Sequence, residues 1–293
     1  MVSRSNLKQT GLPLLALSGF LFLLQAGSLF GHGAFHERIA NVLAEVEKNP
    51  SDPHLWFELA GLHAEHGDLK LTLQDLDWVD ALAPGKFLTE LLRGRAFLEA
   101  NEFAKAKEAL DRQLVAHPEV ARAWLLRARA EQELHQNAAS LTDYREALKR
   151  TASPDPDLVQ EVAGALATHG CETEAAQVLA TGIDRLGKIP SLVLRALELE
   201  MRMKNFDAAL RRVEDAQKDA PRPEPWMARR AAVLEQAGRI EESRAAWKAL
   251  AQHLNSLPER ERTSAAMSRL TEETRQALVA LKSLPTPDSA ATP

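Results

Sequence analysis

The sequence predicts an all-α protein, a solenoid of stacked antiparallel helix hairpins. Three observations predict it. Aromatic residues make up only 5% of the 293 residues, whereas the strong helix formers Ala, Leu, Glu and Arg are plentiful. Apolar residues recur at intervals of three and four, which places them on one face of a helix. The same arrangement of two helices and a turn returns about every 34 residues, a period that is typical of stacked helical hairpins.

Residues 1–31 have the order of a secretory signal. Two basic residues and no acid come first, an apolar stretch over 12–26 follows, and small residues close the segment. The candidate cleavage positions are Ala26, Ser28 and Gly31. The alternative is an uncleaved membrane anchor, because residues 12–30 are just long enough to cross a bilayer as a helix. In both cases we expect an exported protein that is periplasmic or envelope-associated.

Residues 32–52 follow as a single amphipathic helix that is expected to cap the first hairpin. That hairpin consists of helical runs over 54–66 and 69–83, and the dipeptide between them makes the turn. Gly67 suits the left-handed position that ends a helix, and Asp68 suits the cap of the next one. Pro84 ends the second helix, because proline lacks an amide hydrogen and its ring collides with the previous turn.

The same hairpin recurs along most of the chain. Its turns are placed at Gly67, Asn101, His135, Gly170, Lys204 and Gly238, with spacings of 34, 34, 35, 34 and 34 residues. The six predicted units are 53–86, 87–120, 121–155, 156–189, 190–223 and 224–257. A single hairpin cannot cover its own apolar face, so each must stack on the next.

The residues at fixed places in these units identify a family. Large aromatics occur early in the first helix at Trp56 and Trp124, and prolines close units at Pro84, Pro118 and Pro221. Small residues lie within the first helix at Ala60, Gly94, Ala128, Ala163 and Ala231, and at the start of the second at Thr72, Ala106, Ser140, Ala175, Ala209 and Ser243. Over about 53–257 the sequence resembles the tetratricopeptide repeat (TPR) family. The resemblance implies a right-handed superhelix with a concave groove, lined by the first helices, in which peptides commonly lie.

The C-terminal residues complete this plan. Residues 258–284 are predicted to form a capping helix with apolar residues on one face, because the exposed end of a stack needs a polar outer surface. Residues 285–293 have no apolar content to bury and are predicted to be a disordered tail.

Motifs for enzyme chemistry are missing from the sequence. It contains no phosphate-binding glycine loop and no Gly-x-Ser-x-Gly turn, so we expect a protein that is not an enzyme. The net charge of −5 provides no broad basic surface for nucleic acid. Cys171 is the single cysteine and cannot form an intrachain disulfide. The expected partner is an unidentified protein or peptide, with membrane contact only through an uncleaved N-terminus.

The resemblance places a set of side chains in the concave groove. They are Leu91, Arg95, Leu98, Arg122, Leu125, Arg129 and Gln132. Arg95 and Arg129 occupy the same place in neighbouring units and are expected to lie adjacent, where guanidinium groups could bind carboxylates. This predicts an acidic or C-terminal peptide as ligand of a scaffold or adaptor. The alternative is that the arginines pair with Glu99, Glu131 or Glu133 and only make the face soluble.

Four histidines near the N-terminus suggest a second function. His32 and His36 are four residues apart, and His63 and His66 are three apart, so each pair could share a helix face. Neutral imidazole is the commonest metal ligand, which predicts a possible copper or zinc site in a metal-handling envelope protein. The alternative is a polar helix start and two ordinary histidines near a turn. No other cofactor is expected.

Overall fold

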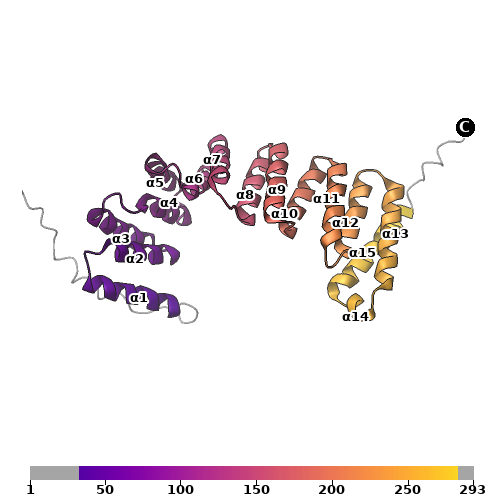
Figure 1. The fold of residues 1–293 in the computed structure, drawn as a ribbon, viewed down its shortest axis with the longest axis horizontal. Coiled ribbons are helices and arrows are strands. Elements are labelled where there is room, and N and C mark those ends of the chain that lie inside the picture. Colours follow the sequence, from indigo (N-terminus) through magenta and orange to yellow (C-terminus); the bar gives the residue numbers. More distant parts are fainter. Residues whose placement is uncertain (1–32, 283–293) are drawn as a thin grey trace, which may run out of the picture. The chain divides into compact units, whose positions relative to one another are not determined.

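The protein is all-helical over residues 33–282, which are the residues that the computed structural model describes (Figure 1). No strand occurs among them, so the prediction of an all-α solenoid is confirmed. The chain divides into two compact units, Met1–Thr89 and Glu90–Pro293. The predicted signal or anchor over 1–31, His32 and the predicted tail over 285–293 lie outside the described residues.

The described helices follow one another in pairs between a first and a last helix. Their bounds are α1 (Gly33–Lys48), α2 (Pro53–Glu65), α3 (Leu69–Leu82), α4 (Thr89–Glu99), α5 (Phe103–Ala116), α6 (Ala121–Glu133), α7 (Asn137–Arg150), α8 (Pro156–Thr168), α9 (Glu172–Leu186), α10 (Pro190–Arg202), α11 (Phe206–Asp219), α12 (Glu224–Gln236), α13 (Ile240–Ser256), α14 (Glu259–Arg262) and α15 (Ala265–Lys282). In the second unit, each helix from α5 to α12 packs against the next one along the chain, and α13 packs against α15.

The turns within the six helix pairs share one backbone geometry. The residues with positive φ at these turns are those at which the sequence places them, Gly67, Asn101, His135, Gly170, Lys204 and Gly238, with φ from 57° to 80°. The amide of the residue after each one donates to the carbonyl five residues earlier, over 2.8–2.9 Å. This is the hydrogen bond of a Schellman motif, and it satisfies a carbonyl that the helix end would otherwise leave unpaired.

Small residues allow the paired helices to approach closely. The predicted small positions are buried, as at Ala60, Ala128 and Ser243, each 0% exposed. Gly94 in α4 shows why the size matters, because a Cβ atom there would lie 2.5 Å from Cγ of Leu110 in α5. Only glycine fits at this contact without moving α5.

Apolar side chains form the core along each unit. In the second unit, one cluster of buried residues extends from α6 to α10 around Tyr144, Leu166 and Leu179. Another extends from α10 to α15 around Leu234 and Leu250. In the first unit, α2 and α3 bury Leu59 and Leu76 between them.

The C-terminal cap differs from the single helix that the sequence predicts over 258–284. The structure divides this segment into the short α14 and the longer α15, which packs against α13 and α12. Ser264 explains the break, because its Oγ accepts a hydrogen bond from the amide of Met267 over 3.3 Å and so caps a new helix.

Candidate functional site

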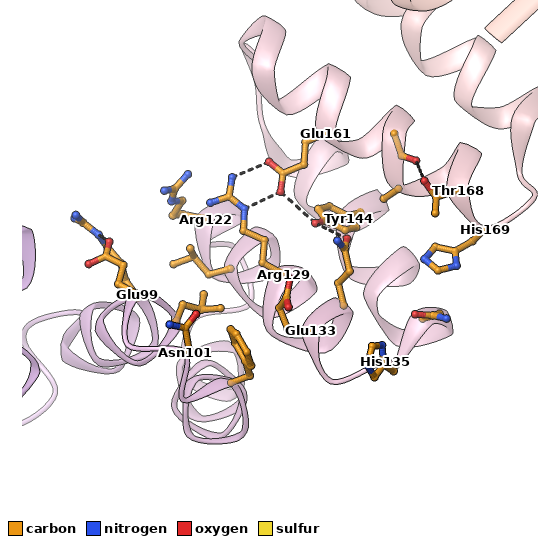
Figure 2. Close-up of a pocket in the computed structure, with 18 of the residues that line it drawn as sticks. Glu99, Asn101, Arg122, Arg129, Glu133, His135, Tyr144, Glu161, Thr168 and His169 are labelled. Atoms are coloured by element: carbon orange, nitrogen blue, oxygen red, sulfur yellow. Dashed lines mark hydrogen bonds and ion pairs between the residues drawn. The ribbon is translucent and has the colours of Figure 1, made fainter. Parts of the chain in front are cut away.

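A hollow of about 900 Å³ lies in the second unit over the first helices of three successive hairpins, α4, α6 and α8 (Figure 2). Its wall on α4 includes Arg95, Leu98 and Glu99. The α6 and α8 walls carry Arg122, Leu126, Arg129, Gln132, Glu133, Gln160, Glu161, Gly164, Ala165, Thr168 and His169. The start of the second helices and the turns supply Asn101, Phe103, His135, Asn137 and Tyr144.

The repeat geometry brings the arginines to this hollow. Arg95 and Arg129 each lie six residues before a left-handed turn residue, Asn101 and His135 respectively. They therefore project from equivalent places on α4 and α6. Arg122 lies seven residues before Arg129, which is about two helical turns and places both on the same face of α6.

Two of the three arginines are already paired with carboxylates. Nε of Arg95 donates to Oε1 of Glu99 over 2.8 Å, one helical turn further along α4. Arg129 forms a bidentate pair with Glu161 of α8, in which Nε and Nη2 each donate over 2.7 Å (Figure 2). The Arg129–Glu161 pair connects two neighbouring hairpins.

Tyr144 and Gln132 extend this pair into a network. The Tyr144 hydroxyl is 3.1 Å from Oε1 of Glu161 and 3.2 Å from Oε1 of Gln132, so it donates to one of these two oxygens at a time. Its ring is 1% exposed in the core below the hollow. Burial, and next the negative charge of Glu161, raise the pKa of Tyr144. The hydroxyl therefore stays protonated and fixes the position of the Glu161 carboxylate.

Arg122 is the arginine of the hollow without a carboxylate partner. Among the residues that the structure describes, no hydrogen bond or ion pair involves its guanidinium, although the residue is exposed. Burial of part of the side chain lowers the pKa of Arg122, and the positive charges of Arg129 and Arg95 lower it further. Because arginine remains charged in proteins, the hollow contains an unpaired positive charge.

Five of the seven predicted groove residues line the hollow, and two do not. Leu125 is 6% exposed and packs in the core with Tyr144 and Leu141. Leu91 packs against the cluster that contains Leu110 and Leu114. The prediction that these two leucines lie in the groove is wrong, because their helix faces turn toward the second helices of the hairpins.

The alternative prediction, in which the arginines pair with Glu99, Glu131 or Glu133, is correct only for Arg95. Glu99 does pair with Arg95, whereas Glu131 is 3% exposed inside the hairpin and Glu133 makes no ion pair in the described part of the chain. Glu161 and Tyr144 are the residues that the sequence analysis missed. A signal for Glu161 existed, since it lies 32 residues after Arg129, close to one repeat period.

The structure separates the predicted pair His63 and His66, whereas the pair His32 and His36 includes a residue outside the described part of the chain. His63 is 6% exposed, and its Nδ1 lies 2.6 Å from Oδ2 of Asp75, so its ring faces α3. Burial raises the pKa of Asp75 despite the opposing effect of His63. His66 instead lies beside His36, with ring centroids 5.1 Å apart. Within residues 33–282, no group of three or more metal-binding side chains is assembled.

Comparison with known proteins identifies a family for part of the second unit. A family model described as tetratricopeptide repeat matches residues 91–156, which include most of α4 and all of α5, α6 and α7. Residues 91–156 therefore match the tetratricopeptide repeat (TPR) family. TPR proteins are, as a family, protein-interaction modules. No helix within residues 33–282 has the length and apolar character of a membrane span.

Solved structures with a similar fold have low sequence identity to this chain. PilF of Pseudomonas aeruginosa is 16% identical, with a TM-score of 0.51 over 65% of this chain and 86% of PilF. A structure of Naa15/Naa10 bound to HypK-THB is 15% identical, with a TM-score of 0.50 over 88% of this chain and 38% of the matched chain. YrrB, described as a TPR protein with an unusual peptide-binding site, is 18% identical over 61% of this chain and 92% of YrrB, with a TM-score of 0.48. No curated protein matches the sequence.

Proposed function

We propose that this TPR protein is a non-enzymatic scaffold or adaptor that binds a carboxylate-bearing peptide segment in the hollow over α4, α6 and α8. The observation that carries the proposal is the unpaired guanidinium of Arg122 inside the hollow. Arg122 is exposed and has no ion pair or hydrogen bond in the described part of the chain, so its guanidinium is accessible to a ligand carboxylate. A guanidinium can also bind a carboxylate through two parallel hydrogen bonds.

The two ion pairs near Arg122 support the binding of an anionic ligand group at this residue. Arg95 and Arg129 are held by Glu99 and Glu161, so their guanidinium groups are oriented before a ligand arrives. At Arg122 their positive charges outweigh the opposing charges of Glu161 and Asp155 and so add to the attraction for a carboxylate. The partly exposed apolar side chains of Leu98 and Phe103 line the same hollow and offer contacts for the rest of the segment.

The proposed place of action is the cell envelope. The basic, apolar and small-residue order of residues 1–31 supports export, either with cleavage of this segment or with its retention as an anchor. The partner would then be another envelope protein that presents an acidic or C-terminal segment.

The proposal is tested by reversing the charge at Arg122. Arg122→Glu should remove proteins that co-purify with the full chain from envelope extract, because the unpaired cation becomes an anion. Arg211→Glu is the matched control, since Arg211 is exposed on α11, has no ion pair in the described part of the chain and does not line the hollow. A partner list that is the same for the wild type and for Arg122→Glu contradicts the proposal.

A second candidate function is metal handling by the N-terminal histidines. The observation that favours it is the contact between the exposed His36 of α1 and the exposed His66 that follows α2. Two imidazoles from separate segments provide two ligands for copper or zinc, and His32 could provide another. Titration calorimetry with copper and zinc should give binding that His36→Ala and His66→Ala each weaken at least tenfold, whereas His117→Ala leaves it unchanged. No heat of binding to the wild-type protein excludes this candidate.

A further inference from the structure

Gly164 lies in the wall of the hollow, in the middle of α8, and packing does not require a glycine there. A Cβ atom at Gly164 would meet only Nη2 of Arg195, at 3.7 Å, which is an ordinary contact with the end of a flexible side chain. Gly94 and Gly182 are different, because a Cβ there would lie 2.5 Å and 2.6 Å from buried leucine and valine side chains. Glycine within a helix is also less favourable than alanine. Neither packing nor stability therefore accounts for Gly164.

The repeat position of Gly164 makes the missing side chain notable. Gly164 lies six residues before the turn residue Gly170, the place that Arg95 and Arg129 hold in the two preceding hairpins. The row of long cationic side chains along the hollow therefore stops at α8. Ala165, which follows Gly164 and also lines the hollow, is small as well. The floor of the hollow at this end is formed by the small residues Gly164 and Ala165 of α8, beside the side chains of Gln160, Glu161 and Thr168.

The polar groups of this floor are already satisfied. The hydroxyl of Thr168 donates to the carbonyl of Gly164 over 2.9 Å, in addition to the hydrogen bonding of the helix. The side-chain amide of Gln160 donates to the carbonyl of Pro156 over 3.2 Å. A ligand group that lies on Gly164 and Ala165 therefore meets a flat surface with no unmet hydrogen bond, which suits an apolar group.

A planar cation lies at the edge of the same floor. Nη1 of Arg195, from α10, donates to Glu198 over 2.8 Å, and this leaves Nη2 beside the open side of Gly164. A guanidinium stacks favourably on aromatic rings, as Arg127 and Arg150 do on the ring of Trp124 at 4.9 Å and 4.8 Å in this chain. A flat backbone surface with a guanidinium at its edge fits an aromatic side chain.

We propose that Gly164 is a specificity-determining residue, which leaves room for an aromatic side chain of the ligand to lie on α8 beside Arg195. This inference rests on the proposed function, because the carboxylate of the same ligand segment would bind Arg122. The partner would then present a carboxylate and, within a few residues of it, a tryptophan, tyrosine or phenylalanine.

Fluorescence anisotropy with short synthetic peptides tests this inference. The probes are fluorescein-labelled glycine peptides with one fixed glutamate and one tryptophan, placed one to four residues before it. Each has a twin with alanine in place of tryptophan. The wild type should bind at least one tryptophan peptide about tenfold more tightly than its twin. Gly164→Leu should reduce this ratio to about one and leave the affinity for the alanine twin unchanged, because leucine fills the space over the floor.

Matched variants separate this effect from others. Gly61→Leu changes the same repeat position in α2, where a Cβ meets no atom within 4 Å, and should keep the tenfold ratio. Arg122→Gln should weaken both peptides by the same factor. If the wild type does not prefer the tryptophan peptides, or if Gly164→Leu keeps the preference, the proposed role of Gly164 is wrong. The proposed carboxylate site at Arg122 is not affected by that outcome. If no probe binds the wild type, the carboxylate site itself is wrong, and this inference fails with it.

Discussion

At the scale of single residues, a buried acid in the third hairpin, α6–α7, lacks the basic partner that the same pair of positions provides in two other hairpins. His63–Asp75 and Glu200–Arg212 are buried pairs at one repeat position, four residues before and eight after the turn residue. In the α6–α7 hairpin these places hold Glu131 and Asp143, two acids. Asp143 is bound by Nε of Arg127 over 2.6 Å, and Oε2 of Glu131 is buried with no hydrogen-bond partner.

This environment favours the protonated form of Glu131. Burial, and next the charge of Asp143, raise the pKa of Glu131 to about 7, although Arg127 and Lys107 oppose the shift. Nζ of Lys107 is 3.9 Å from Oε1 of Glu131 and 2.8 Å from Asp111, so it is shared between two acids. The folded state therefore binds a proton at Glu131 that the unfolded chain releases near pH 4.5.

Stability should consequently fall as the pH rises from about 4.5 through 7. The folded state is the better proton binder over this window, so the free energy of unfolding decreases with pH by up to about 3 kcal/mol. Glu131→Gln keeps the neutral form at every pH and should raise the melting temperature at pH 8 by several degrees, with little change at pH 5. Differential scanning calorimetry at both pH values measures this. The exposed Glu133→Gln serves as the control, and equal effects of the two substitutions at pH 8 would count against a buried charge at Glu131.

At the scale of elements, the sequence was sufficient to predict the helix hairpins. It was not sufficient to predict the contacts between one hairpin and the next. The turn positions could be predicted because a left-handed residue such as Gly170 or Lys204 is a local requirement of the backbone. The helix faces followed from spacing along one helix. The break at Ser264 was missed, because a serine within a helical pattern is read as a surface residue unless its hydroxyl is known to bond a nearby amide.

The candidate site could likewise be predicted only as far as the place of a side chain in its own helix decides where it points. Arg95, Arg122 and Arg129 reached the hollow because their places in the repeat fix their direction. Leu91 and Leu125 did not, since a difference of one or two positions turns a helical side chain from the groove to the core. The pairing of Arg129 with Glu161 depends on how one hairpin is rotated against the next, which no local pattern specifies.

At the scale of the whole molecule, stability is expected to be a sum of hairpin energies and interface energies between neighbours. Each helix from α5 to α12 packs on the next one in the chain and α13 packs on α15, so among the described residues the main contacts of the second unit join neighbouring hairpins. In such arrays a local change affects the nearest interfaces first. The C-terminal cap provides a test, because α15 covers the last hairpin at a distance in sequence from the hollow.

Leu281 is the residue of α15 through which this behaviour can be measured. Its side chain is 0% exposed in the cluster that includes Trp247 and Leu250, and its carbonyl accepts a hydrogen bond from Arg244 of α13 over 2.8 Å. Leu281→Ala should cost about 2–5 kcal/mol at this interface. Hydrogen exchange followed by mass spectrometry should show lost protection in α12, α13 and α15, with protection in α4, α6 and α8 unchanged. Val279→Ala, at a side chain that is 56% exposed on the same helix, should change none of these. Equal loss of protection from α4 to α15 would mean that the second unit unfolds as one cooperative block, and the hollow would then depend on its distant cap.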